Sequence, residues 1–139
     1  MKTFLYFSFS LFLAFSVLAQ KVDPTYKQVS YGPHEDMTLN FWKIESQNPA
    51  PLLVHIHGGG WLGGKKHEKA NANELKHGYS FASIDYRLAG VELLPAAVHD
   101  AARAIQFLRT KASDWNFDPN RIAVTGGSAG AASSLWLAY

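Results

Sequence analysis

The ten residues from Arg121 to Gly130 constrain the fold of this chain more than any others. They read Arg-Ile-Ala-Val-Thr-Gly-Gly-Ser-Ala-Gly, a short β-branched run that leads into Gly-x-Ser-x-Gly and then into alanines. This pattern predicts a strand, a very tight turn and the start of a helix, with Ser128 on a strained backbone and its hydroxyl pushed out of the sheet. Gly126 and Gly130 fit such a turn, because a side chain at either position would collide with the neighbouring strand or helix. Ser128 is therefore a candidate nucleophile, whereas the same letters in a loop would make only a local turn.

Strands and helices alternate along the rest of the chain. Residues 26–31 and 37–44 are expected to form an antiparallel hairpin, because both stretches alternate and Gly32-Pro33 makes a turn between them. Residues 52–57 are nearly all apolar, which indicates a strand buried on both faces of a parallel sheet. The expected elements after them are a helix at 68–76, a strand at 81–86, a helix at 95–111, a loop at 114–120 and the strand before Ser128. This order predicts an α/β fold with a mostly parallel sheet flanked by helices.

A second glycine-rich stretch follows residues 52–57 directly. It reads His57-Gly58-Gly59-Gly60-Trp61. A serine hydroxyl is a poor nucleophile, and it needs both a base and N–H donors that hold the oxyanion formed after attack. Three glycines after a buried strand leave backbone N–H groups that no side chain shields. We expect these N–H groups and that of Ala129 to converge on an oxygen beside Ser128.

Together the two glycine-rich motifs resemble α/β-hydrolase fold esterases of the hormone-sensitive-lipase-like, carboxylesterase type. Asp85-Tyr86-Arg87-Leu88 and Pro95-Ala96-Ala97-x-x-Asp100 are similar to two further stretches of that family, so the resemblance covers about residues 35–139. Residues 90–92 depart from the family, which often has proline-glutamate there. The resemblance implies that Ser128 is the nucleophile. It also implies that Gly58, Gly59 and Ala129 supply the oxyanion N–H groups, and that Gly60 and His57 shape the loop.

The activity implied by this resemblance is hydrolysis of carboxylic esters through an acyl-enzyme, without a cofactor. Its substrates are expected to be short acyl esters, including acetyl esters of carbohydrates. In the family the catalytic acid and histidine follow the serine at a distance. Residues 20–139 are therefore interpreted as the N-terminal portion of a single hydrolase domain, inactive by itself, because all six histidines precede Ser128. Two alternatives stay open: amide or formamide hydrolysis on the same fold, and a non-catalytic binding protein on this scaffold.

Two nucleotide-binding patterns overlap the glycine-rich loop, and neither is favoured. Residues 58–63 follow a strand and Asp85 ends the next one, as in a dinucleotide fingerprint, but that turn should open directly into a helix. Here residues 64–66 intervene before any helix. Residues 59–65 nearly match a phosphate-binding loop, yet Lys66 replaces the serine or threonine that holds magnesium.

Four other polar groups are given structural interpretations. His55 and His57 alternate along a strand as metal ligands do, but no third ligand is evident, and packing with hydrogen bonds to backbone is favoured. Asp85 and Arg87 are expected to fix the loop after their strand, with a buried Arg–carboxylate pair. Two sets are expected at the surface: the helix pair His99 and Asp100, and the basic run of Lys65, Lys66, His67 and Lys69.

Residues 1–19 have the pattern of a signal peptide. Lys2 precedes an apolar run, and Val17-Leu18-Ala19 suits cleavage before Gln20, so the protein is expected to be secreted or periplasmic. The chain has 13 Lys and Arg against 11 Asp and Glu, and loss of Lys2 leaves a formal charge of +1. This balance predicts no nucleic-acid partner and no membrane partner after cleavage. With no cysteine, disulfides and thiolate metal sites are excluded.

Overall fold

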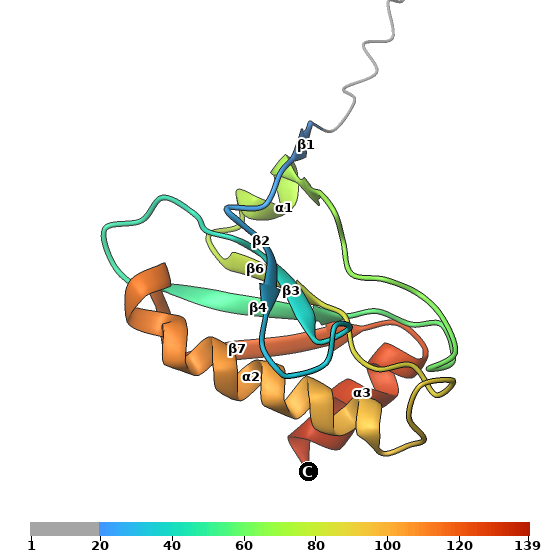
Figure 1. The fold of residues 1–139 in the computed structure, drawn as a ribbon. Helices are drawn as coiled ribbons and strands as arrows, with labels where there is room; N and C mark the ends of the chain where they lie inside the picture. Colours follow the sequence, from blue (N-terminus) through green and yellow to red (C-terminus); the bar gives the residue numbers. More distant parts are fainter. Residues whose placement is uncertain (1–19) are drawn as a thin grey trace, which may run out of the picture.

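A five-stranded sheet with two long helices on one face carries the glycine-rich motifs (Figure 1). The computed structural model describes residues 20–139. The strands lie in the order β2-β3-β6-β4-β7, which makes β7 an edge strand of the described sheet. Their bounds are Tyr26–Ser30 for β2, Thr38–Trp42 for β3, Ser80–Ile84 for β6, Ala50–Ile56 for β4 and Phe117–Gly126 for β7.

The expected topology is confirmed. β2 and β3 form the antiparallel hairpin, and β3 also pairs antiparallel with β6. β6, β4 and β7 are parallel, so the chain crosses over between them through the helices, as in α/β proteins. The helix α2 (Ala96–Trp115) connects β6 to β7, and α3 (Ala129–Ala138) follows β7. Figure 1 shows both helices on the same face of the sheet.

The core lies between the sheet and α2. Leu52, Val54 and Ile56 alternate along β4 with exposed fractions of 1% or less, and they pack against the buried face of α2. That face is built from small and branched residues at helical spacing: Ala97, Ala101, Ala104, Ile105, Leu108 and Ala112. The alanines let the helix lie close to the sheet. The ends of β4 and β7 are neighbours because these strands pair in parallel, with Ile56 opposite Gly126.

The expectation that residues 52–57 are buried on both faces is wrong within the described part of the chain. β4 alternates between buried and half-buried residues, with Leu53 and His55 on the less covered face. β6 is the strand whose five residues are all buried. It lies between β3 and β4, and its second face is covered by Trp42 and Ala70 around Phe81.

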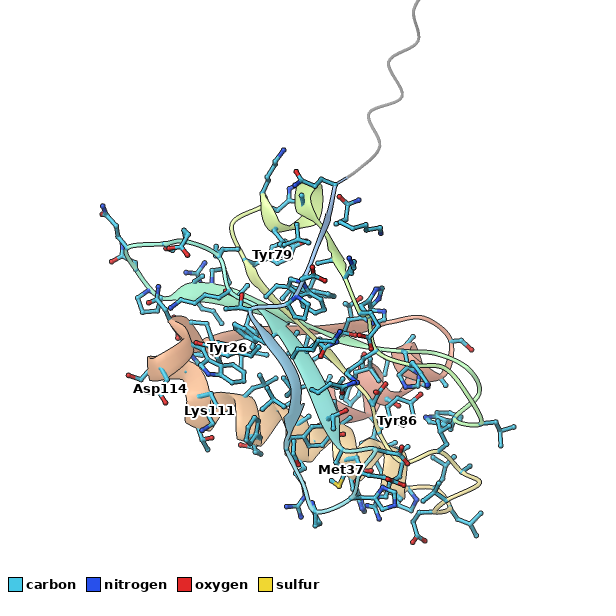
Figure 2. The ribbon with its side chains drawn as sticks, turned by 45° about the horizontal axis from the view of Figure 1, so that its top comes forward. Tyr26, Met37, Tyr79, Tyr86, Lys111 and Asp114 are labelled. Carbon is cyan, nitrogen blue, oxygen red and sulfur yellow. The ribbon has the colours of Figure 1, made fainter. Side chains whose placement is uncertain are left out.

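The helix expected at 95–111 runs four residues further, so the loop expected at 114–120 is wrong in part. Trp115 is 6% exposed and its indole stacks on Tyr26 with ring centroids 4.6 Å apart. Figure 2 shows Tyr26 beside the end of α2 that carries Lys111 and Asp114. This aromatic contact with a distant strand stabilises the last turn of the helix.

The turn expected at residues 118–120 is present as a bulge inside β7. The N–H of Asn120 donates to Asp118 Oδ1 at 2.9 Å, an Asx turn. Pairing jumps from Ala50 with Phe117 to Leu52 with Ile122, so several residues of β7 leave the ladder before regular pairing resumes.

The helix expected at 68–76 is mostly absent. Only α1 (Ala72–Leu75) is helical, and it follows a short strand β5 (Ala70–Asn71). β5 pairs antiparallel with β1 (Lys21–Val22), and Ala70 is 2% exposed. The pairing with the N-terminal segment holds the chain extended where its local pattern favours a helix.

Three connections gather at one end of the sheet. Because β6, β4 and β7 are parallel, the segments that follow them leave from the same edge. Figure 1 shows the loop after β4, the loop after β6 and the turn between β7 and α3 at this end. The signal peptide expected at residues 1–19 lies outside the described residues. Within residues 20–139, no helix has the length and apolar character needed to cross a bilayer.

Candidate active site

Ser128 occupies the turn between β7 and α3 with φ 54° and ψ −120°. An L-residue other than glycine rarely adopts this conformation, so the strain expected from Gly-x-Ser-x-Gly is confirmed. Ser128 is the N-cap residue of α3, yet its side chain makes no capping hydrogen bond. The residue is exposed. Its hydroxyl is thus presented to solvent instead of serving the helix, which is what a nucleophile requires.

The two flanking glycines are required by space. A Cβ on Gly126 would lie 2.5 Å from the carbonyl oxygen of Ile56, and one on Gly130 would lie 2.1 Å from the same oxygen. Both distances are far shorter than van der Waals contact. The end of β4, the turn and the start of α3 therefore pack backbone against backbone, as the sequence predicts.

The glycine-rich loop lies directly against the serine turn. A Cβ on Gly58 would be 2.7 Å from the carbonyl oxygen of Gly127 and 3.5 Å from Ser128 Cβ. Gly59 has φ 111°, and its carbonyl accepts the N–H groups of Leu62 at 3.0 Å and Gly63 at 3.1 Å. The structure thus brings the loop expected to hold an oxyanion beside the candidate nucleophile.

Ala129 is the third residue whose N–H group the sequence predicts as an oxyanion donor. It is the first residue of α3, and the first N–H groups of a helix have no intrahelical acceptor. The helix dipole adds partial positive charge at this end, which favours an anion. Among the predicted site residues, Gly60 lies at the exposed tip of the loop with φ 63°.

His57 holds the start of the loop, as expected from packing and backbone hydrogen bonds. Its Nδ1 lies 2.7 Å from the carbonyl oxygen of Gly58, and its ring stacks on Tyr86 with centroids 4.2 Å apart. The Tyr86 hydroxyl donates to the carbonyl oxygen of His57 at 2.8 Å. Burial, followed by the charge of Asp85, raises the pKa of Tyr86 to about 12. The phenol therefore stays protonated at neutral pH and remains a donor to the loop (Figure 2 labels Tyr86).

Lys66 is not part of a solvated basic face, which corrects the expectation from the lysine run. Its side chain is 3% exposed, and Nζ donates to Asp85 Oδ2 at 2.6 Å and to Thr38 Oγ1 at 3.1 Å. Its backbone N–H donates to Asp85 Oδ1 at 2.5 Å. His57 Nε2 lies 3.7 Å from the same Oδ1. Lys65, by contrast, is exposed, as are His67 and Lys69.

Arg87 pairs with Asp100, and the surface pair expected at residues 99 and 100 is wrong. Asp100 is 1% exposed. Its Oδ2 accepts from the backbone N–H and Nε of Arg87 at 3.0 and 2.9 Å, and its Oδ1 accepts from Nη2 at 2.7 Å. The buried Arg–carboxylate pair expected for the loop after β6 therefore exists, but its carboxylate comes from the first turns of α2 and not from Asp85.

The described contacts of the histidines are with groups other than Ser128. His57 is bonded to the loop backbone, His34 pairs with Asp36, and His77 stacks on Tyr79. The rings of His55 and His67 contact each other at 4.5 Å between centroids. His99 is exposed on α2. A general base must lie within about 2.6–3.2 Å of the proton it removes, and none of these contacts supplies that arrangement.

The neighbouring backbone does not have the form of a nucleotide site. Residues 58–69 form turns and loops, and the next element is the strand β5, so no helix opens from the glycines. A phosphate-binding loop has serine or threonine at the position of Lys66. Here the Lys66 ammonium group donates a hydrogen bond to the Asp85 carboxylate. Among the side chains that the structure describes, no three His, Cys, Asp or Glu residues cluster as metal ligands.

The arrangement just described matches a known family over most of the chain. Residues 40–139 match the family model BD-FAE. The chain belongs to the BD-FAE family. It is 37% identical over 108 residues to carboxylesterase NlhH of Mycobacterium tuberculosis, an alignment that covers 75% of this chain and 34% of that protein. The fold and the serine turn thus belong to a chain related to known esterases.

Solved structures agree with this family membership. A truncated form of a carbohydrate esterase from gut microbiota superposes with a TM-score of 0.71 and 28% identity, covering 78% of this chain and 41% of that one. An esterase from Pyrobaculum calidifontis superposes with a TM-score of 0.60 and 28% identity, covering 72% of this chain and 34% of that one. The chain spans about a third of the length of the carboxylesterase NlhH sequences that it matches.

The burial of three polar residues near the site was not predicted from the sequence. Lys66 and Asp100 carry charges that normally mark a surface, and Ser133 follows an alanine run without any motif. Each is buried by a contact with a segment far away in the sequence. Arg87 and Asp100 both fall in stretches that resemble the family, and this resemblance is the sequence signal that could have paired them.

Proposed function

We propose that this chain carries the nucleophile and the oxyanion-binding groups of a serine carboxylic ester hydrolase. The observation that carries the proposal is the exposed Ser128, strained at φ 54°, against which the backbone of Gly58 lies. Membership of the BD-FAE family and 37% identity to a carboxylesterase support the reaction class.

In the proposed reaction, Ser128 Oγ attacks the ester carbonyl carbon. The carbonyl oxygen gains negative charge and accepts hydrogen bonds from the N–H groups of Gly58, Gly59 and Ala129. The C–O bond to the alcohol then breaks, and the alcohol leaves as it takes up the proton that Oγ released. Water attacks the resulting acyl-enzyme and frees the acid and the serine. Glycines at the loop leave these N–H groups unshielded, so the backbone can approach the oxyanion closely.

The base and the acid that orients it are proposed to come from polypeptide outside residues 20–139. The described histidine contacts place none of the six rings on the Ser128 hydroxyl, and the family order puts the acid and histidine after the serine. His57 in particular is bonded to the Gly58 carbonyl and stacked on Tyr86. It shapes the loop and does not take the proton.

The substrates are proposed to be short acyl esters, among them acetyl groups on carbohydrate. The support is the likeness to a carbohydrate esterase at 28% identity. The test compares p-nitrophenyl acetate with acetylated xylo-oligosaccharides, with matched amide and formamide substrates beside them. The assay uses an enzyme that contains this chain together with its acid and histidine, and Ser128→Ala is the control.

Ester turnover that Ser128→Ala abolishes is the expected result. Faster turnover of the amide or formamide would replace the proposal by amide hydrolysis. Absence of turnover, together with failure of an organophosphorus reagent to label Ser128, would favour a non-catalytic binding protein.

We further propose that the protein is exported, with cleavage before Gln20. The support is the apolar run that follows Lys2 and ends in Val17-Leu18-Ala19. Sequencing the N-terminus of the protein from the envelope or medium is expected to give Gln20. An intact Met1 in that fraction would contradict export by cleavage.

A further inference from the structure

A tryptophan of the glycine-rich loop is bonded to the helix that begins at the nucleophile. Trp61 Nε1 donates a hydrogen bond of 3.1 Å to Ser133 Oγ on α3. Ser133 is 1% exposed and Trp61 is half-buried, so the hydroxyl end of this bond lies out of water. We propose that Trp61 and Ser133 are positioning residues, which fix the distance between the oxyanion N–H groups of the loop and that of the helix. This inference rests on the proposed function.

The place of Ser133 on α3 explains why the bond matters for geometry. Residues four apart on a helix lie on the same face, one turn from each other. Ser133 therefore lies one turn beyond Ala129, whose N–H is a proposed oxyanion donor. The loop that carries Gly58 and Gly59 is thus joined by a side chain to α3, one turn beyond the third donor.

The backbone conformation of Trp61 shows that tertiary contacts, and not local preference, hold the glycine-rich loop in its conformation. Trp61 has φ 59°, a conformation that bulky residues rarely adopt. Such a conformation persists only when the surroundings determine it. Three contacts do so here: the bond to Ser133, the N–H of Ala89 donating to the Trp61 carbonyl oxygen at 2.7 Å, and packing of the half-buried ring against the main core.

Loss of the bond is expected to act on geometry more than on folding. A single neutral hydrogen bond contributes little net stability, because its partners bond to water in the unfolded chain. A shift of about 1 Å in a catalytic group, however, can lower a rate about 100-fold. The N–H groups of Gly58 and Gly59 depend on such distances, because they act on the oxyanion of the transition state.

The first experiment examines, by NMR, the enzyme that contains this chain together with its acid and histidine. In ¹⁵N-labelled protein, Ser133→Ala is expected to shift the indole N–H resonance of Trp61 and to speed its hydrogen exchange. The amide resonances of Gly58 and Gly59 are expected to move as well. The Trp61 signal is identified by its loss in Trp61→Phe.

The matched control is Ser134→Ala at the next position of the helix. The Ser134 hydroxyl donates to the carbonyl oxygen of Gly130 at 2.8 Å, within α3, so its loss should leave the Trp61 indole and the loop amides in place. Equal and small effects of Ser133→Ala and Ser134→Ala on these signals would overturn the inference.

The second experiment measures kinetics with p-nitrophenyl acetate in the enzyme that contains this chain and its acid and histidine. Ser133→Ala is expected to lower kcat by about 10-fold or more with KM changed less than about 2-fold, because the N–H groups act mainly on the transition state. Trp61→Phe, which keeps the aromatic ring, should give the same split, and the double variant should lose no more than either single one. Ser134→Ala should stay near wild type.

The outcomes separate the two proposals. Turnover that Ser128→Ala abolishes, with wild-type kcat in both Ser133→Ala and Trp61→Phe, overturns the positioning role and leaves the hydrolase. A rise in KM at unchanged kcat also contradicts it, because the bond would then serve substrate binding. Turnover that survives Ser128→Ala overturns the proposed function and this inference with it.

Discussion

Replacing Lys66 by methionine is expected to destabilise the chain strongly, although the sequence places this lysine in a run of surface residues. Lys66 Nζ lies 2.6 Å from Asp85 Oδ2, and the two side chains are 3% and 18% exposed. Methionine fills a similar volume but leaves the Asp85 carboxylate without its cation. It also removes the donor to Thr38 Oγ1 on β3.

The expected loss is about 3 kcal/mol of unfolding free energy. Removing one partner of a buried ion pair costs about 3–5 kcal/mol, because the other charge stays buried and uncompensated. The lower end applies here, since the backbone N–H of residue 66 still donates to Asp85 Oδ1 and the carboxylate keeps some contact with water. In the larger domain that contains this chain, about 2 °C per kcal/mol applies, and the melting temperature should fall by roughly 6 °C.

The assay is urea unfolding of the purified enzyme that contains this chain with its acid and histidine, followed by circular dichroism. Lys65→Met is the matched control, because Lys65 is the exposed neighbour of Lys66. It should change the unfolding free energy by less than about 0.5 kcal/mol. The double variant Lys66→Met with Asp85→Asn should recover part of the loss, since no buried charge remains. Equal stability of the two single lysine variants, or no recovery in the double variant, would refute the reasoning.

Three further predictions follow from the site. In the enzyme with its acid and histidine, Gly59→Pro should lose at least about 2.7–4 kcal/mol of transition-state stabilisation, because it removes an oxyanion donor. The control Gly63→Ala should stay active, because an added Cβ there meets no atom within 4 Å. A folded, fully active Gly59→Pro would contradict the assignment. Residues 20–139 alone should show essentially no p-nitrophenyl ester turnover and should tend to aggregate through the open edge of β7; a soluble monomer whose turnover depends on Ser128 would mean that one of the six histidines is the base. Neither NAD nor ATP should bind, and micromolar affinity by calorimetry would reverse this expectation.

The strand, turn and helix around Ser128 were determined by the sequence. Glycines at 126 and 130 allow the backbone of the neighbouring strand to pack where a side chain would collide with it. The β-branched run before them favours a strand, so these local residues specify the geometry of the turn. The same is true of the glycine-rich loop after β4 and of the order of the elements, because hydrophobic period and glycine placement act over a few residues. The parallel arrangement of β6, β4 and β7 follows from that order.

Only the tertiary structure decided which residues are buried by partners far away in the chain. Lys66 and Asp100 carry charges that a sequence pattern assigns to the surface, and they are buried because Asp85 and Arg87 meet them across the fold. The last turn of α2 depends on Tyr26, and β5 replaces a helix because the N-terminal segment pairs with it. These outcomes depend on contacts between segments that the sequence separates, and local propensity carries no information about which segments will meet.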